Sequence, residues 1–391
     1  MTVTSEPTSR AIVVPPGLRG VVVSDTTTGD VRGDEGFYHY RQYSAVDLAR
    51  ARSFEDVWFL FFEGHLPDAA ERDRFLARIA GLRRLPEELD TVLPTLATTA
   101  GGLTGLRAAL SILGAARDLG PTWGASPEQR TRDAMLVCAA TPTILAALYR
   151  LRLGLDPVEP RDDLHGAANW LHLLTGDEPD PRHVAAVEHY LVATVDHGFN
   201  ASTFTARVVA SAGSDVASAV TAAIGAFVGP LHGGAPDRAL ASLDEIGTVD
   251  RIDPYVRDRL RSGDRIMGFG HAVYRTEDPR ARMLRDIAEG LRDQGLDGTG
   301  LVDLAVAVEK RVVEILAELK PDRELNANVE FYAGVVMALC GIPREMFTPT
   351  FAVSRVVGWS AHILEQSQGS TIIRPAARYV GPPPPQPVPA G

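Results

Sequence analysis

Apolar residues recur at helical spacing along most of the chain. One run has four apolar residues at intervals of three and four positions, which are Val184, Val187, Leu191 and Val195. This run follows Asp180-Pro181 and predicts an amphipathic helix that ends at His197-Gly198. In an Asp-Pro pair the carboxylate can cap free N–H groups, and proline fits the first helical turn. Asp253-Pro254 and Asp278-Pro279 are therefore predicted to open two more helices.

Five further segments show helical patterns, and only one stretch differs. The helices are predicted at about Ser202 to Ala212, Ser214 to Val228, Leu301 to Leu319, Asn328 to Cys340 and Thr350 to Gln366. Between Leu18 and Tyr40, β-branched residues alternate with Gly and Asp, which predicts two or three short strands joined by turns. The predicted fold class is therefore all-α, with short N-terminal β-strands.

Composition sets limits on domain number and setting. With 391 residues, 45% hydrophobic and 23% charged, the chain can form two domains or one domain with an inserted lobe. Cys138 and Cys340 lie in apolar runs and are expected to be buried free thiols, which favours a reducing environment. The N-terminus does not resemble a signal peptide, and the apolar stretch Ala134 to Tyr149 is short for a membrane span. A soluble, cytoplasmic protein is expected.

The net charge of −11 argues against non-specific binding to nucleic acid or to an anionic membrane. If the ligands are anionic, cationic residues must gather around them locally. The two ends of the chain, residues 1–16 and 382–391, are polar or Pro-rich and are expected to be flexible.

Three histidines lie in Gly-rich turns or at helix ends: His197 in DHGFN, His232 in GPLHGG and His271 in MGFGHAVYR. Neighbouring glycines let a ligand approach the backbone and leave the ring unshielded. Any one of them alone could equally be a structural histidine, but three in similar settings favour function. The spacings are long, and HExxH and cysteine clusters are missing, so no metal site is predicted. Acid/base chemistry near neutral pH fits better.

Four arginines are candidate anion ligands. Arg280 follows a predicted cap, where the helix dipole disfavours a cation, so a bound anion would explain it. Arg275 lies four residues after His271, and Arg374 lies near the C-terminus. Arg355 lies among apolar residues and must pair with a carboxylate of the protein or of a ligand. The alternatives are a solvated arginine at 280 and structural salt bridges at 355 and 374.

Glu330 opens the predicted helix NVEFYAGVVMALCG. A glutamate in a first helical turn is commonly just a partner for the helix dipole, and the residue alone carries little functional information.

Several long motifs, in order, resemble the citrate synthase family, including 2-methylcitrate synthases. They are GLRGVVVSDTTTGDVRG, VDHGFNASTFTARVVAS, IGAFVGPLHGGAPD, MGFGHAVYRTEDPRAR, NVEFYAGVV and GIPREMFTPTFAVSRVVGWSAHILEQ. The resemblance covers roughly residues 17 to 381. It implies a large helical domain of residues 17–228 plus 336–381 and a small domain of residues 229–335. It also implies an active site in the cleft between them and a homodimer in which Arg374 is lent to the neighbouring subunit.

The resemblance further implies the roles of individual residues in condensing acetyl-CoA with oxaloacetate. His232 resembles the group that stabilises the enolate, and His271 resembles the acid for the ketone oxygen. Ligands of oxaloacetate are implied at His197, Arg280, Arg355 and Arg374, and a CoA contact is implied at Arg275. No cofactor is implied, because acetyl-CoA is a substrate.

The carboxylate base is where the chain departs from the family pattern. Most members have Asp in NVDFY, whereas this chain has Glu330, which is one methylene longer. A displacement near 1 Å can cost about a hundredfold in rate. The chain resembles a bacterial branch of citrate synthase-like proteins that has Glu in this place, so Glu330 is interpreted as an adapted base. Two alternatives to citrate synthesis remain, a 2-methylcitrate synthase that uses propionyl-CoA and a catalytically silent paralogue that binds oxaloacetate or CoA.

Overall fold

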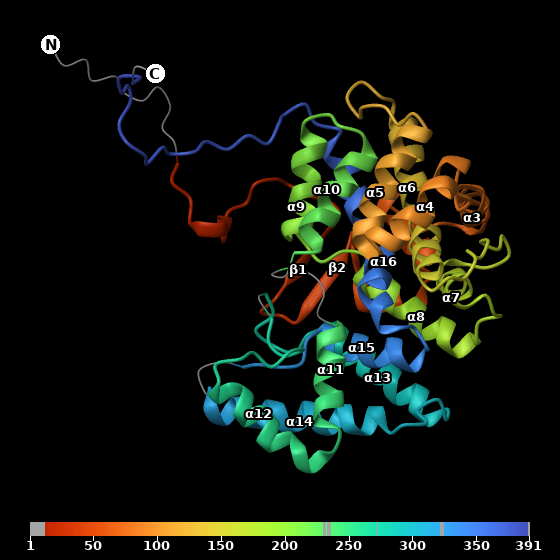
Figure 1. Cartoon of the computed structure of the whole chain (residues 1–391), viewed down its shortest axis with the longest axis vertical. Coiled ribbons are helices and arrows are strands. Elements are labelled where there is room, and N and C mark those ends of the chain that lie inside the picture. Colours follow the sequence, from red (N-terminus) through yellow and green to blue (C-terminus); the bar gives the residue numbers. More distant parts are fainter. Residues whose placement is uncertain (1–11, 230–231, 233–235, 272, 321–323, 390–391) are drawn as a thin grey trace.

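Helices make up nearly all of the regular structure and form two groups (Figure 1). The computed structural model describes residues 12–229, 232, 236–271, 273–320 and 324–389. The first group holds α1 (Ala45–Ala51), α2 (Phe54–Glu63), α3 (Ala69–Leu82), α4 (Glu87–Thr99), α5 (Gly102–Ala116), α6 (Pro127–Arg152), α7 (Gly166–Thr175), α8 (Pro181–Thr194), α9 (Ala201–Ser211), α10 (Val216–Phe227) and α16 (Phe347–Gln366). The predicted all-α fold class is confirmed.

The second group lies in the lower part of Figure 1 and holds the helices between α10 and α16. They are α11 (Pro236–Ile246), α12 (Ile252–Arg261), α13 (Pro279–Asp293), α14 (Leu301–Leu319) and α15 (Val329–Leu339). Helix α15 packs on α11 and α13 and also contacts α8 of the first group. The predicted small domain, residues 229–335, begins between the two groups, and its far boundary falls inside α15.

A small antiparallel sheet of order β1-β2-β3 precedes the helices. Its strands are β1 (Gly29–Arg32), β2 (Phe37–Tyr40) and β3 (Tyr43–Ser44). Short strands were predicted between Leu18 and Tyr40, and two of the three lie there, but residues 19–28 form none. Tyr38 and Tyr40 are buried, and their hydroxyls donate to the carbonyls of Ala193 and Val192 over 3.1 and 3.0 Å. These bonds fix the sheet against the C-terminal end of α8.

Helix α6, with 26 residues, runs through the first group and packs on α4, α5 and α16. It is longer than the apolar stretch Ala134 to Tyr149, so its length and composition alone would allow a membrane span. However, 78% of its most apolar window is buried inside the protein. Packing within the helical core therefore accounts for its apolar composition. Cys138 and Cys340 are buried free thiols, as predicted.

Most predicted helix boundaries agree with the structure to within three residues. The helix predicted from Leu301 to Leu319 is α14, and α8 ends at Thr194, three residues before His197. As expected, Asp180 and Asp278 cap α8 and α13 with their carboxylates.

The prediction for Asp253-Pro254 was wrong. Helix α12 begins at Ile252, and its N-cap is Arg251, which makes no side-chain capping bond. The Asp253 carboxylate instead accepts a 2.5 Å hydrogen bond from Arg311 on α14. Because none of the first N–H groups of a helix has an intrahelical partner, proline fits at more than one position of the first turn. An Asp-Pro pair therefore does not fix which residue is the cap.

Candidate active site

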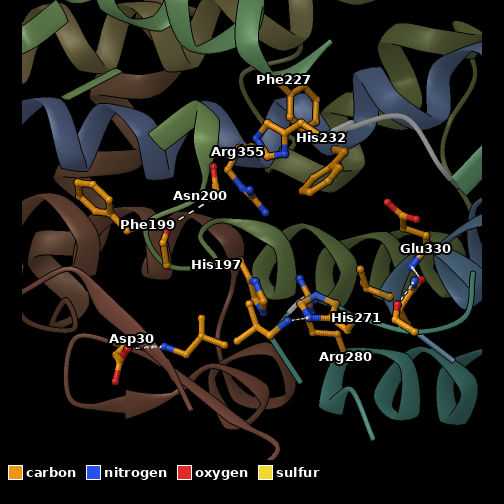
Figure 2. Close-up of a pocket in the computed structure, with 17 residues that line it drawn as sticks. Asp30, His197, Phe199, Asn200, Phe227, His232, His271, Arg280, Glu330 and Arg355 are labelled. Carbon is orange, nitrogen blue, oxygen red and sulfur yellow. Dashed lines mark hydrogen bonds between the residues drawn. The ribbon is translucent and has the colours of Figure 1, made fainter. Parts of the chain in front are cut away.

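Six of the eight predicted site residues line one cavity of about 490 Å³ (Figure 2). They are His197, His232, His271, Arg280, Glu330 and Arg355. His232 and Arg355 lie on one side of the cavity, and His271 and Arg280 lie on the opposite side (Figure 2). The two helix groups therefore both contribute side chains to it.

His197 lies in the turn between α8 and α9. Its Nε2 is 3.0 Å from the hydroxyl of Tyr274, and its ring centroid is 5.4 Å from that of His271. Burial, together with the positive charge of Arg280, holds the pKa of His197 well below its usual range. The ring is therefore neutral at physiological pH.

The tautomer of His232 follows from its contacts with the first turn of α9. Its Nε2 accepts the backbone N–H of Ser202 over 3.2 Å, so the ring proton must be on Nδ1. The Ser202 hydroxyl lies 2.8 Å from the same nitrogen and accepts from the Trp359 indole over 3.1 Å. Burial, with the charge of Arg355, lowers the pKa of His232. A neutral His232 can thus donate from Nδ1 to an oxygen in the cavity.

His271 has the opposite tautomer. Its Nδ1 accepts the backbone N–H groups of Val273 and Tyr274 over 3.0 and 3.1 Å, which places the proton on Nε2. Burial, reinforced by Arg280 and partly offset by Asp278, lowers the pKa of His271 to about 4. Nε2 lies 3.3 Å from the guanidinium of Arg280, which is also a donor. Both groups therefore remain available to an acceptor such as a keto oxygen or a carboxylate.

Arg280 is buried and paired with the carboxylate that caps its own helix. Its Nε and one terminal nitrogen donate to Asp278 over 3.0 and 2.8 Å. Burial alone would lower the pKa of Arg280, but the Asp278 carboxylate outweighs burial and raises it. The sequence interpretation, a bound anion at this helix start, must be corrected in part, because a protein carboxylate already offsets the charge.

Arg355 on α16 is 2% exposed, and its Nε donates to the carbonyl of Thr194 over 2.9 Å. Its guanidinium lies 4.5 Å from the ring centroid of Phe351. In the described part of the chain it forms no ion pair with a carboxylate. Burial lowers its pKa, although Asp196 acts in the opposite direction. Of the two partners predicted for Arg355, a carboxylate of a ligand fits this arrangement better.

The backbone around Arg355 is held by a close helix contact. A Cβ at Gly358 would lie 2.1 Å from the carbonyl oxygen of Val195, so α16 touches the end of α8 directly. The next residue, Asp196, accepts from the His362 ring of α16 over 3.2 Å. Helices α8 and α16 therefore hold His197 and Arg355 in a fixed relation.

Glu330 is the second residue of α15, and its backbone N–H donates to the side chain of the N-cap Asn328 over 3.0 Å. Burial raises the pKa of Glu330 to about 7, even though Arg280 opposes the shift. No hydrogen bond to its carboxylate occurs within the described residues. A carboxylate with this pKa in a cavity is suited to remove a proton near neutral pH.

Arg275 and Arg374 do not line the cavity. Both are exposed, and the backbone N–H of Arg275 donates to the carbonyl of Gly33, in the turn after β1, over 3.1 Å. Their predicted roles stay predictions. No group of three His, Cys, Asp or Glu side chains is placed to hold a metal ion in residues 12–389 apart from the gaps given above.

Several residues that shape the site were not predicted. Asn200, Phe227 and Asn328 line the cavity, and Ser202 fixes the tautomer of His232. Asn200 lies in the DHGFN motif, so a polar cap beside His197 could have been found. Sequence spacing gives no sign that Ser202 would contact His232, thirty residues away.

Comparison with known proteins identifies the fold that builds this cavity. The sequence model described as Citrate synthase, C-terminal domain, matches residues 17–376. The chain belongs to the citrate synthase family. It is thus an enzyme of the acyltransferase type that citrate synthases represent.

Relatives in this family match the chain over nearly its full length. Citrate synthase 2 of Bacillus subtilis is 38% identical over 94% of this chain and 95% of that protein. The crystal structure of citrate synthase from Pyrobaculum aerophilum has a TM-score of 0.87 and 37% identity, and the match covers 100% and 99% of the two chains. Citrate synthase from Thermoplasma acidophilum, solved as a ternary complex with carboxymethyl coenzyme A and oxaloacetate, has a TM-score of 0.86 and 28% identity, and the match covers 95% of this chain and 97% of that one.

Proposed function

We propose that this chain condenses acetyl-CoA with oxaloacetate and hydrolyses the resulting citryl-CoA to citrate and CoA. The observation that carries the proposal is one cavity that holds a carboxylate with a raised pKa, two neutral imidazoles with opposite tautomers and two buried arginines. Its members are the residues that the family resemblance assigned to this reaction. The ternary complex of the Thermoplasma relative supports the same pair of ligand classes.

Each group has a distinct task in the proposed reaction. Glu330 removes a proton from the methyl group of acetyl-CoA, and the N–H of His232 stabilises the enolate oxygen that forms. The enolate carbon attacks the keto carbon of oxaloacetate, whose oxygen takes the Nε2 proton of His271. The proton that Glu330 removed then returns to His271, so that both groups regain their starting protonation states. This step forms one carbon–carbon bond and yields citryl-CoA. Water then cleaves the thioester and releases the carboxylate of citrate and the CoA thiol.

The two buried arginines suit a dicarboxylate. Arg355 has a positive charge without a carboxylate partner in the described structure, and Arg280 keeps donors near the cavity after pairing with Asp278. Charge-assisted bonds to both carboxylates would orient the keto carbon for attack. The cationic groups thus lie together in a chain of net charge −11, as expected for an acidic protein that binds anionic ligands.

Thiol release tests the proposed reaction directly. The purified chain is expected to release CoA thiol from acetyl-CoA when oxaloacetate is added, and none without it. Faster release from propionyl-CoA would instead favour 2-methylcitrate synthesis. Because one methylene changes discrimination by only about 1 to 3 kcal/mol, the two acyl donors should be compared by kcat/KM. Absence of thiol release with either donor, combined with oxaloacetate binding, would support the silent paralogue.

The pH dependence of turnover should reflect Glu330. A base with a pKa of about 7 is protonated and inactive below that pH, so kcat/KM is expected to rise as the pH increases through about 7. His271 has a pKa of about 4 and stays neutral over this range. Initial rates between pH 5.5 and 9 check this prediction. A profile that is flat across neutral pH would contradict it.

We further propose that the protein is a homodimer in which the partner supplies Arg374, and that residues 229–335 form the small domain. Residues 12–22 and 375–389 extend away from the helices, where they could reach a second chain (Figure 1). They lie beyond Ser24 and Ile373, which still contact Arg207 and Ser211 of α9. Static light scattering is expected to give twice the 42.0 kDa mass of one chain. A monomer mass at micromolar concentration would exclude this assembly.

A further inference from the structure

The carboxylate of Asp278 connects Arg280 with the start of the helix that carries Glu330. Asp278 is 1% exposed, and its carboxylate accepts four hydrogen bonds. Three come from Arg280, through its backbone N–H, its Nε and a terminal nitrogen, over 3.0, 3.0 and 2.8 Å. The fourth comes from the backbone N–H of Val329 over 3.2 Å. Asp278 therefore caps its own helix and also contacts the first residue of α15.

The fourth bond is the unusual one, because it crosses between elements 51 residues apart. Val329 directly precedes Glu330, so the position of the Glu330 backbone depends on this contact. The N-cap Asn328 adds a second tie, because its side-chain amide donates to the carbonyl of Gly270 over 2.9 Å. Gly270 in turn precedes His271. The start of α15 is thus tied both to the cap of α13 and to the turn that carries His271.

We propose that Asp278 is a positioning residue that holds Arg280 and the start of α15 in one geometry, so that oxaloacetate and the proton-abstracting carboxylate are aligned together. This inference rests on the proposed function. Asp278 is not expected to bind the substrate itself, because both of its carboxylate oxygens already accept hydrogen bonds from protein donors.

The charge of Asp278 has a second effect on Glu330. The charged groups that act on Glu330 are Arg280 and Asp278 at the start of α13 and Arg238 on α11. The charge of Glu330 also acts on Tyr190 of α8, and neutral His232 and His271 line the same cavity as Glu330. Of these groups, Asp278 contributes the negative charge that raises the pKa of Glu330, while the two arginines lower it. Removing that charge should make Glu330 a weaker base.

Asp278→Asn separates this role from simple structural support. An amide keeps the side-chain shape, but its NH2 group faces donors of Arg280 or Val329 and leaves Arg280 unpaired. The KM for oxaloacetate is expected to rise about tenfold or more, because a misplaced guanidinium orients the substrate poorly. The acid limb of the kcat/KM profile is the rise of kcat/KM with pH. Its midpoint is expected to shift to a pH about one unit lower, because Glu330 loses a neighbouring negative charge and its pKa falls.

Two further variants complete the test. Asp278→Glu keeps the charge but not the geometry, so it should raise the KM for oxaloacetate and leave the acid limb near that of the wild type. Asp56→Asn is the matched control, because Asp56 is 3% exposed and pairs with Arg72 through two 2.6 Å bonds, and neither residue lines the cavity. It should lower thermal stability without changing the KM or the pH profile.

The outcomes distinguish this inference from the proposed function. A KM for oxaloacetate in Asp278→Asn that equals those of the wild type and Asp56→Asn would overturn the positioning role. An unshifted acid limb would overturn the effect of its charge on Glu330. If Asp278→Asn does not fold, wild-type KM and kcat in Asp278→Glu would overturn the positioning role equally. Failure of the proposed function has another signature, which is a wild-type chain that releases no CoA thiol when acetyl-CoA and oxaloacetate are supplied.

Discussion

Replacing Glu330 by glutamine is expected to lower kcat by about 10³-fold while leaving oxaloacetate binding intact. A positioned general base contributes roughly 10²- to 10⁴-fold, and an amide of the same size cannot accept the methyl proton. Oxaloacetate should still bind, because its proposed ligands are Arg280, Arg355 and the imidazoles. Thiol release measures the first effect, and calorimetric titration with oxaloacetate measures the second.

Glu330→Asp provides the matched control. It restores the residue that most of the family has in the NVDFY motif and keeps a carboxylate, though its reach is one methylene shorter. Its kcat should lie between those of Glu330→Gln and the wild type. Turnover in Glu330→Gln within tenfold of the wild type would contradict the assignment of Glu330 as the base.

Arg355→Met is expected to weaken productive oxaloacetate binding strongly without destabilising the fold. Removing one partner of a buried charged contact costs about 2 to 5 kcal/mol of binding, so the KM for oxaloacetate should rise about 100-fold. The free protein, however, loses a buried cation that forms no ion pair in the described structure. Its melting temperature should be unchanged or higher, because burying a charge without a partner is unfavourable. Differential scanning calorimetry with and without oxaloacetate measures both effects.

Arg83→Met is the contrasting variant. Arg83 is also buried, at 7% exposed, but it pairs with Glu55 over 3.4 Å and donates to the carbonyl of Leu164 over 2.7 Å. Its loss leaves a buried carboxylate without its cation and should lower the melting temperature while sparing the KM for oxaloacetate. A melting temperature that falls as far in Arg355→Met as in Arg83→Met would show that Arg355 has a structural role.

The sequence predicted the parts of the site that short local patterns encode. Glycines beside His197, His232 and His271 indicated rings that a ligand can approach, and all three line the cavity. Apolar neighbours of Arg355 indicated a buried cation that needs an anionic partner. Local spacing also predicted most of the helices, because amphipathic periodicity and capping are properties of neighbouring residues.

Contacts between distant elements could not be predicted in this way. The bond from the Ser202 backbone to His232 selects a tautomer, yet it depends on where α9 lies relative to a turn thirty residues later. The contact of Asp278 with Val329 likewise depends on the packing of α13 against α15. Arg280 was expected to meet an external anion, whereas the adjacent cap already supplies one, because the side chain folds back over its own helix start.

The direct contact at Gly358 also indicates where the enzyme can change shape. The backbones of α16 and of the residue after α8 pack directly on each other there, without a side chain between them. Because this contact leaves little free space between α8 and α16, we expect a rearrangement that admits substrates to involve the opposite wall, formed by the turn at His271 and the starts of α13 and α15. In hydrogen exchange, amides of that wall should gain protection on ligand binding, while those around Val195 should already be slow in the free enzyme.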